Sequence, residues 1–339
     1  MAQRVVVVGG GAAGMQTALE LKMRGVEPII VERDIELGGK ARGWHKLFPS
    51  FTPAGDILKP IIARVREERI RCFYGQEVTE IASDGVVLRS GERIPGDAVV
   101  VATGFTLFDA HRKQEYGYGL YDNVITSVDL ERMMNSGRVV LTDGSEPRRI
   151  AILHCVGSRD EKVGQRHCSK VCCITGVKQA IELKQMFPDA DVFNFYMDIR
   201  MFGPGYEELY RAAQEEYNVH FIRGRISEAA ETINKRIQIK AEDTLTGRPL
   251  RMTVDMLVLL VGMSANYENP TLAQSADIRL APNGYFSTVD TFLGSVRSHR
   301  EGIFFAGAAT APKSLADTLA EASLTASAVC DYLKSRYNK

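Results

Sequence analysis

The sequence predicts an α/β protein built from two Rossmann-like domains, with the second inserted into the first. Residues 4–8 (Arg-Val-Val-Val-Val) form a short apolar run, which a glycine-rich loop and a helical pattern follow. A similar run begins at Arg149, and residues 97–104 are echoed by residues 255–262 with the same spacing from aspartate to glycine. Strand, loop and helix signals that recur in this way indicate two units of one architecture.

The repeat also predicts domain bounds. We expect a first domain of residues 1–110 and 275–339, an inserted domain of residues 149–265, and a connection over residues 111–148. A chain of 339 residues is long enough for two such domains.

Composition excludes some partners. Lysine plus arginine and aspartate plus glutamate number 42 each, so no overall field attracts nucleic acid or an anionic membrane. No apolar run approaches the ~20 residues that span a bilayer. We therefore expect a cytoplasmic protein with no transmembrane segment and no nucleic-acid partner.

The first glycine loop, residues 9–14, matches a dinucleotide-binding turn. Gly9 would permit the tight turn, Gly11 would let backbone amides approach a pyrophosphate, and Gly14 would let helix and strand pack closely. Glu32 ends the second apolar run, where an acid would accept hydrogen bonds from a ribose.

Further segments resemble the FAD domains of flavoproteins with two dinucleotide-binding domains, and so favour FAD over NAD. They are Gly38-Gly39-Lys40, the run that ends in Ala102-Thr103-Gly104, and Gly307-Ala308 before a long helix from about Leu315. Ala308 is a departure, because those flavoproteins usually carry aspartate there. The residues expected to contact FAD are Gly9, Gly11, Ala12, Ala13, Gly14, Glu32, Arg33, Gly39, Lys40, Val78, Ala102, Thr103, Gly104, Gly307 and Ala308.

Four of the six cysteines lie where the inserted domain would carry its own glycine loop. Cys155 follows a predicted strand, and Cys168, Cys172 and Cys173 surround the start of a predicted helix. Four thiolates suit a [4Fe-4S] cluster, a [2Fe-2S] cluster or tetrahedral zinc. The residue spacing leaves these open, together with a redox disulfide or unligated core cysteines.

Two lysines are candidates for tuning a flavin. Lys178 lies on the predicted helix after the cysteines, and Lys313 lies in the loop before the C-terminal helix. A cation near the flavin would favour its anionic reduced form. The alternative is that each is a solvated lysine.

Several segments together resemble the A subunit of heterodisulfide reductases: residues 155–160 (Cys-Val-Gly-Ser-Arg-Asp), residues 168–173 (Cys-Ser-Lys-Val-Cys-Cys) and residues 198–206. In that family the matching cysteines bind a [4Fe-4S] cluster beside FAD. The resemblance therefore implies that Cys155, Cys168, Cys172 and Cys173 are cluster ligands. It also implies electron transfer among flavin, cluster and partner subunits that handle a thiol and disulfide couple, and a homodimer within a larger complex.

Two differences from that family, both in cysteine content, restrict the function that we expect for this chain. The chain runs from its first predicted strand to its last predicted helix without further cysteine-rich modules, and the Phe48-Pro49-Ser50 segment has no cysteine nearby. We expect one cluster, no electron bifurcation, and a short form similar to the heterodisulfide-reductase-like systems of sulfur-oxidising prokaryotes. The chain would be an oxidoreductase component that needs partners for turnover. The alternatives are an NAD(P)H-dependent flavin disulfide reductase and a zinc-bearing flavoprotein scaffold.

Overall fold

A computed structural model describes residues 3–337 and divides them into two compact units. Within the described residues, unit 1 comprises residues 3–42, 54–106 and 264–337, and unit 2 comprises residues 43–53 and 107–263. The chain thus leaves unit 1 twice and returns twice. At two of these crossings it forms the short strands β10 (Phe105–Leu107) and β19 (Met263–Ala265).

Unit 1 is built on a five-stranded parallel sheet in the order β20-β9-β1-β2-β5. The central strand β1 (Arg4–Val8) pairs with β2 (Glu27–Val31) on one side and β9 (Ala98–Val101) on the other. Its valines are buried on both faces, as the apolar run predicts. The remaining strands are β5 (Arg71–Phe73) and β20 (Ile303–Phe305).

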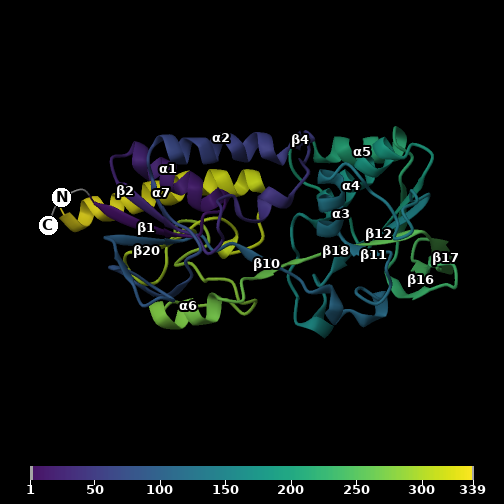
Figure 1. Ribbon diagram of the computed structural model, residues 1–339. Helices are drawn as coiled ribbons and strands as arrows, with labels where there is room; N and C mark the ends of the chain where they lie inside the picture. Colours follow the sequence, from purple (N-terminus) through teal and green to yellow (C-terminus); the bar gives the residue numbers. More distant parts are fainter. Residues whose placement is uncertain (1–2, 338–339) are drawn as a thin grey trace. The chain divides into compact units, whose positions relative to one another are not determined.

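Three helices lie on one side of this sheet: α1 (Ala12–Met23), α2 (Ala54–Glu67) and α7 (Leu315–Tyr337) (Figure 1). On the other side an antiparallel sheet of β6 (Val78–Ala82), β7 (Gly85–Leu88) and β8 (Arg93–Pro95) packs with α6 (Asn269–Ala276). The bounds of α7 confirm the predicted start of the C-terminal helix at Leu315. Ser314 and Asp317 begin it with reciprocal side-chain to backbone hydrogen bonds.

Unit 2 repeats this plan. Its parallel sheet has the order β11-β18-β12-β13-β14, and an antiparallel sheet has the order β15-β16-β17. In the parallel sheet the strands are β11 (Val124–Thr126), β12 (Arg149–Val156), β13 (Asp191–Tyr196), β14 (His220–Arg223) and β18 (Met256–Val261). The antiparallel strands are β15 (Ile226–Glu231), β16 (Ile237–Asp243) and β17 (Arg248–Val254).

The helices of unit 2, α3 (Ser127–Asn135), α4 (Cys172–Met186) and α5 (Tyr206–Glu215), lie on one side of its parallel sheet (Figure 1). A short hairpin, β3 (Lys46–Leu47) and β4 (Thr52–Pro53), completes the unit. The two parallel sheets confirm the predicted α/β class with two Rossmann-like units.

The boundaries differ from the expected ones. Residues 111–148, expected as a connection, lie within unit 2, where β11 pairs with β18 as the edge strand of the sheet. Residues 264–274, part of which was assigned to the insertion, lie in unit 1, which contains α6. A three-residue edge strand carries too little periodicity for the sequence to indicate its pairing.

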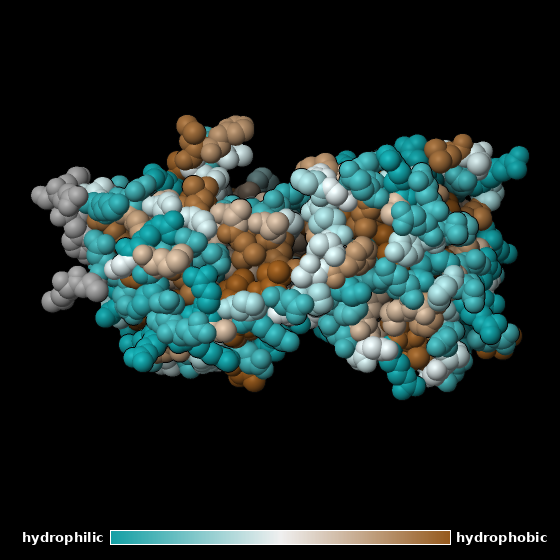
Figure 2. All heavy atoms as spheres, turned by 90° about the horizontal axis from the view of Figure 1, so that it is seen from above, coloured by the Kyte–Doolittle hydropathy of each residue, from teal (hydrophilic) through white to brown (hydrophobic). Residues whose placement is uncertain are grey.

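The surface agrees with the balanced composition. Figure 2 shows hydrophilic residues over most of the face that it draws, interrupted by separate groups of hydrophobic ones. None of the helices in the described part of the chain combines the length and apolar character needed to cross a membrane.

Candidate cofactor sites

The first glycine loop of unit 1 has a geometry that only glycine tolerates. Gly9 has a φ of 108°, and a Cβ built there would lie 2.4 Å from the carbonyl oxygen of Ala102. A Cβ on Gly14 would lie 1.9 Å from the carbonyl oxygen of Gly9. These close approaches place the loop between the ends of β1 and β9 and pack α1 tightly against them.

Gly11 has a different role, because it leaves open space. A Cβ there would find only the Cα of Gly39, at 4.0 Å. Gly11 is the N-cap of α1 and offers no side-chain cap to the helix. The amides of Ala12 and Ala13 therefore begin a helix whose positive end faces free volume, as a pyrophosphate site requires.

Glu32 is held beside this loop. Its carboxylate accepts hydrogen bonds from the backbone N–H of Gly10 at 2.5 Å and of Asp34 at 2.8 Å, and only 5% of the residue is exposed. A buried carboxylate with two amide donors keeps further acceptor capacity for a ribose hydroxyl. Arg33, the next residue, is instead engaged at the surface by Glu268 and Tyr267.

The loop after β20 reaches the same place. Gly307 has a φ of 67°, and a Cβ there would lie 2.6 Å from the Cβ of Ala13. Its N–H donates to Glu321 Oε2 at 2.8 Å. Ala308 follows in a buried turn. No sequence pattern indicates the role of Glu321, because it lies a helical turn and a half inside α7 and its partner is 14 residues away.

Lys313, a predicted flavin-tuning residue, is part of this turn. Its ammonium donates to Glu321 at 2.7 Å, to Thr310 Oγ1 at 2.7 Å and to the carbonyl oxygen of Gly307 at 2.9 Å. These contacts assign Lys313 to fixing the Gly307 turn beside the loop.

Two further side chains of unit 1, those of Thr103 and Lys40, are candidates to contact a bound cofactor. The hydroxyl of Thr103 is buried and has no hydrogen-bond partner among the described residues. Lys40 lies with its Nζ 5.5 Å from the ring centroid of Phe105, and burial lowers the pKa of its ammonium. Of the other expected residues, Ala102 and Gly104 flank Thr103, Gly39 precedes Lys40, and Val78 is buried in β6. An orphaned hydroxyl and a desolvated cation next to a glycine cradle suit a bound dinucleotide.

In unit 2 the corresponding turn after β12 is built differently. Cys155 has a φ of 60°, and the pairing of β12 with β18 shifts register between Leu153 and Val156. A Cβ on Gly157 would lie 1.9 Å from the ring of Phe108. That ring occupies the space beside the turn, so the open glycine loop of unit 1 has no counterpart here.

Three of the predicted ligand cysteines converge at the start of α4. The Sγ atoms of Cys155 and Cys172 lie 3.9 Å apart, and Cys173 lies next to Cys172 with its thiol 3.6 Å from the carbonyl oxygen of Asp198. All three residues are buried. Cys168 is partly exposed and accepts a hydrogen bond from the backbone N–H of Lys170 at 3.4 Å.

Their mutual contacts change the acidity of these thiols. Hydrogen bonding with Cys172 lowers the pKa of Cys155 to about 7 and that of Cys173 to about 4, and the same contacts raise the pKa of Cys172. His154, which bonds Asn194 at 2.8 Å, supports the Cys173 thiolate. Burial opposes the charged imidazole, but Cys173, Asn194 and Cys155 together outweigh burial and raise the pKa of His154.

Cations also lie near the cysteines. Arg159 forms an ion pair with Asp198 at 2.6 Å, which lowers the pKa of that carboxyl. Asp198 also contacts Arg200 at 3.4 Å. The positive charge of Arg159 favours the thiolate form of Cys155.

The four cysteines provide sulfur donors for a metal, but in the described structure they do not form a complete metal site. Within residues 3–337 no group of three or more histidine, cysteine, aspartate or glutamate side chains is arranged to hold a metal ion. The 3.9 Å between Cys155 and Cys172 is close to the ~3.8 Å between two thiolates on one tetrahedral zinc ion. In a [4Fe-4S] cluster each thiolate binds a separate iron, so the sulfurs would have to move apart.

Lys178, the other predicted flavin-tuning residue, is buried inside unit 2. Its ammonium contacts Glu131 at 2.5 Å, Glu182 at 3.1 Å and the carbonyl oxygen of Lys46 at 3.0 Å. His45 completes this group with its Nδ1 2.8 Å from Glu182. Two of these contacts are hydrogen bonds, to Glu131 and to the carbonyl oxygen of Lys46, and the third is an ion pair with Glu182. Lys178 is therefore buried among carboxylates rather than solvated.

Comparison with known proteins agrees with this architecture. Residues 3–326 match the model of the family described as pyridine nucleotide-disulphide oxidoreductase. Two thioredoxin reductases have the same fold over 98% of the chain. The Lactococcus lactis enzyme has a TM-score of 0.70 at 16% identity over 99% of its length, and the T. acidophilum enzyme has 0.67 at 17% over 98%.

Curated relatives are more similar in sequence. The chain is 44% identical to the A subunit of the H(2)/formate:CoB-CoM heterodisulfide,ferredoxin reductase of Methanococcus maripaludis. It is 33% identical to the iron-sulfur A subunit of the CoB--CoM heterodisulfide reductase of Methanocaldococcus jannaschii. Both matches cover 96% of this chain and 63% of the relative, so the chain spans less than two thirds of their length.

Proposed function

The chain belongs to the pyridine nucleotide-disulphide oxidoreductase family, and from that premise we propose that it is an electron-transfer component that binds FAD in unit 1 and a [4Fe-4S] cluster in unit 2. Its similarity to the A subunits of heterodisulfide reductases supports a place in thiol–disulfide or sulfur metabolism. Partner subunits would carry out substrate chemistry, and the chain itself would form a homodimer within that complex.

The glycine cradle supports the FAD half of the proposal. The α1 N-terminus at Gly11 would bind the pyrophosphate, Glu32 would accept a hydrogen bond from the adenosine ribose, and Lys40 would neutralise phosphate charge. Thr103 would donate its orphaned hydroxyl. FAD supplies the exchange between two-electron and one-electron chemistry.

The cysteine segment is the observation that carries the cluster half. It stands at the turn where the inserted domain of a nicotinamide-dependent flavoenzyme binds its nucleotide, and the ring of Phe108 fills the space beside that turn. Cys155, Cys168, Cys172 and Cys173 would supply the four thiolates, and Arg159 would stabilise their charge. Cys72 and Cys330 lie elsewhere, so these 339 residues offer ligands for one cluster. One cluster would give the flavin one route for electron transfer within these residues, which favours simple electron transfer over bifurcation, and we propose a place in a heterodisulfide-reductase-like system on that ground.

An anaerobic reductive titration tests the proposal. Reconstituted protein should take up about three electrons per chain, two into the flavin and one into the cluster. NADH and NADPH should leave the flavin oxidised. Rapid flavin bleaching by either nucleotide would contradict the proposal.

A second candidate follows from the closeness of Cys155 and Cys172. Their sulfurs would need to approach by about 2 Å to form a disulfide. That disulfide would then accept two electrons and two protons from the reduced flavin to give the dithiol, as a disulfide reductase requires. Mild oxidation would remove two of six titratable thiols from iron-free protein, and a Cys155→Ser variant would lose none.

A further inference from the structure

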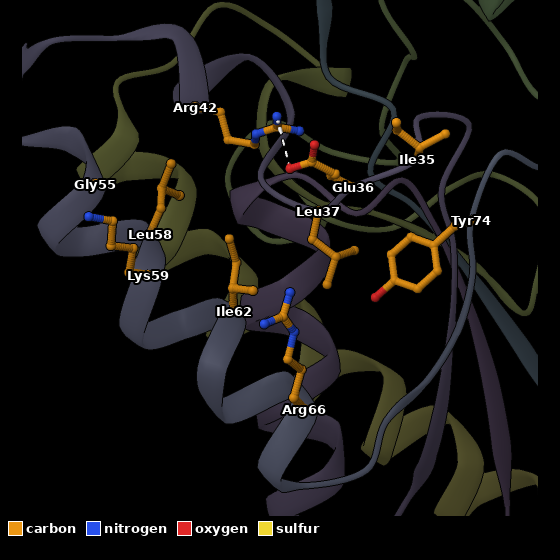
Figure 3. A pocket seen from close by; sticks show the side chains of 10 residues that line it. All are labelled: Ile35, Glu36, Leu37, Arg42, Gly55, Leu58, Lys59, Ile62, Arg66 and Tyr74. Carbon is orange, nitrogen blue, oxygen red and sulfur yellow. Dashed lines mark ion pairs between the residues drawn. The ribbon is translucent and has the colours of Figure 1, made fainter. Parts of the chain in front are cut away.

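A pocket of unit 1 lies outside the residues assigned to FAD. It has a volume of about 550 Å³ and is formed by the loop after β2, by α2 and by Tyr74 (Figure 3). This volume is in the usual range for small-molecule sites. None of the fifteen residues expected to contact FAD lines it.

The inner surface of the pocket is apolar. Leu37 and Leu58 are buried at its base with 4% and 2% of their surface exposed, and Ile62 is half-buried on α2. Ile35 and Tyr74 lie at the outer wall and remain 82% and 42% exposed. Exposed apolar side chains beside an apolar base are typical of a binding surface.

Positive charge surrounds this apolar base. Arg42, Lys59 and Arg66 line the pocket with a single carboxylate, that of Glu36. Glu36 pairs with Arg42 at 3.0 Å. The side chains of Lys59 and Arg66 form no hydrogen bond or ion pair with any residue between 3 and 337, and Figure 3 shows the Arg66 guanidinium turned toward Leu37.

We propose that this pocket binds a small anion with an apolar chain, such as a medium-chain carboxylate or alkyl phosphate. The Arg66 guanidinium, which is turned toward Leu37, would bind the head group, and the leucines and Ile62 would bury the chain. Lys59, whose ammonium lies near Gly55, would add positive charge at the rim of the pocket. Arg42 and Glu36 neutralise each other, and Lys59 and Arg66 leave the pocket with a positive charge. A positively charged pocket favours an anionic ligand.

One wall of the pocket packs against the glycine segments that are expected to hold FAD. The side chain of Leu37 lies 2.5 Å from the Cβ position of Gly10, and Arg42 Cγ lies 2.5 Å from that of Gly38. A ligand that contacts Leu37 and Arg42 therefore touches side chains packed on the segments expected to hold FAD.

Titration calorimetry on the full chain loaded with FAD tests the proposal, with octanoate and octyl phosphate as probes. Both should bind, octan-1-ol and acetate should not, and each methylene added between hexanoate and octanoate should tighten binding up to about fourfold. Arg66→Gln and Lys59→Gln should each weaken octanoate binding roughly two- to fivefold.

Arg64→Gln is the matched control. Arg64 is on the same helix but outside the pocket, where its guanidinium lies 3.6 Å from Met23 Sδ. The Arg64→Gln variant should bind octanoate with the same affinity as the unchanged protein. All three variants should keep their flavin absorbance. No binding at millimolar octanoate, equal binding of octan-1-ol, or an equal loss in Arg64→Gln would overturn the proposal. A rise in octanoate affinity on FAD removal would show instead that the probe enters the flavin cradle.

Discussion

The thiols of Cys155 and Cys172 lie 3.9 Å apart although 17 residues separate them in the chain. A left-handed residue at the end of β12 and the first turn of α4 bring them together. The N-terminal end of a helix favours thiolates, which is the form that binds metal. The position that we propose to hold pyrophosphate in unit 1 thus corresponds to the one that carries the cysteines in unit 2.

Glu32→Ala should abolish flavin binding and lower stability. The substitution removes the acceptor of two backbone N–H groups, those of Gly10 and Asp34, as well as the ribose contact. We expect the free energy of unfolding to fall by about 2–4 kcal/mol. Urea denaturation and flavin absorbance measure the two effects.

Glu36→Ala is the control for that experiment. Its side chain is 58% exposed and its partner Arg42 is 42% exposed. The free energy of unfolding should change by less than ~0.5 kcal/mol, with full flavin content. An equal loss in both variants would show that Glu32 has no special role.

Lys178→Met should destabilise the protein without changing the flavin spectrum. It leaves the buried carboxylates of Glu131 and Glu182 without their cation. The expected loss is about 3–5 kcal/mol, and adding Glu131→Gln should recover part of it. A shifted flavin potential with unchanged stability would restore the flavin-tuning role that the sequence predicts.

Lys40→Met should weaken FAD binding but not the FAD-free fold. Burial holds the pKa of Lys40 below its ordinary value of 10.5, so the unfolded chain binds this proton more strongly than the folded one. Stability of the FAD-free protein should therefore rise as pH increases through the interval below 10.5, and Lys40→Met should remove that rise. At neutral pH the variant should be at least as stable as the parent.

FAD affinity gives the second readout for Lys40. The loss of a cation at the pyrophosphate should raise the Kd for FAD roughly tenfold. The Kd of the parent should increase as pH rises through the lowered pKa, whereas that of Lys40→Met should stay flat. An unchanged Kd in the variant would place the pyrophosphate away from Lys40.

Local patterns predicted the elements that position both sites. The strand at residues 4–8 and the helix at residues 172–186 have the bounds that their apolar periodicity indicates. The glycine spacing predicted the tight turn after β1, in which a Cβ on Gly14 would meet the carbonyl oxygen of Gly9 while Gly11 leaves open space. The echo of residues 97–104 in residues 255–262 predicted the second sheet, since β9 and β18 have equivalent places beside the central strands.

Distant pairings could not be predicted in this way. Glu131 lies 47 residues before Lys178 and on another helix, so no spacing rule links them. The partners of Lys313 likewise depend on how α7 packs beside the Gly307 turn. Both lysines were interpreted from their nearness in sequence to cofactor motifs, and that nearness does not indicate the carboxylate and carbonyl partners that the structure gives them.

Iron, acid-labile sulfide and zinc quantification on anaerobically purified protein tests the central claim most directly, with Cys172→Ser and Cys72→Ser measured beside the parent. The parent and Cys72→Ser should each contain about four iron and four sulfide per chain, because Cys72 lies apart from the four proposed ligands. Cys172→Ser should keep its flavin and lose its iron. One zinc without sulfide in the parent, or unchanged iron in Cys172→Ser, would contradict the account.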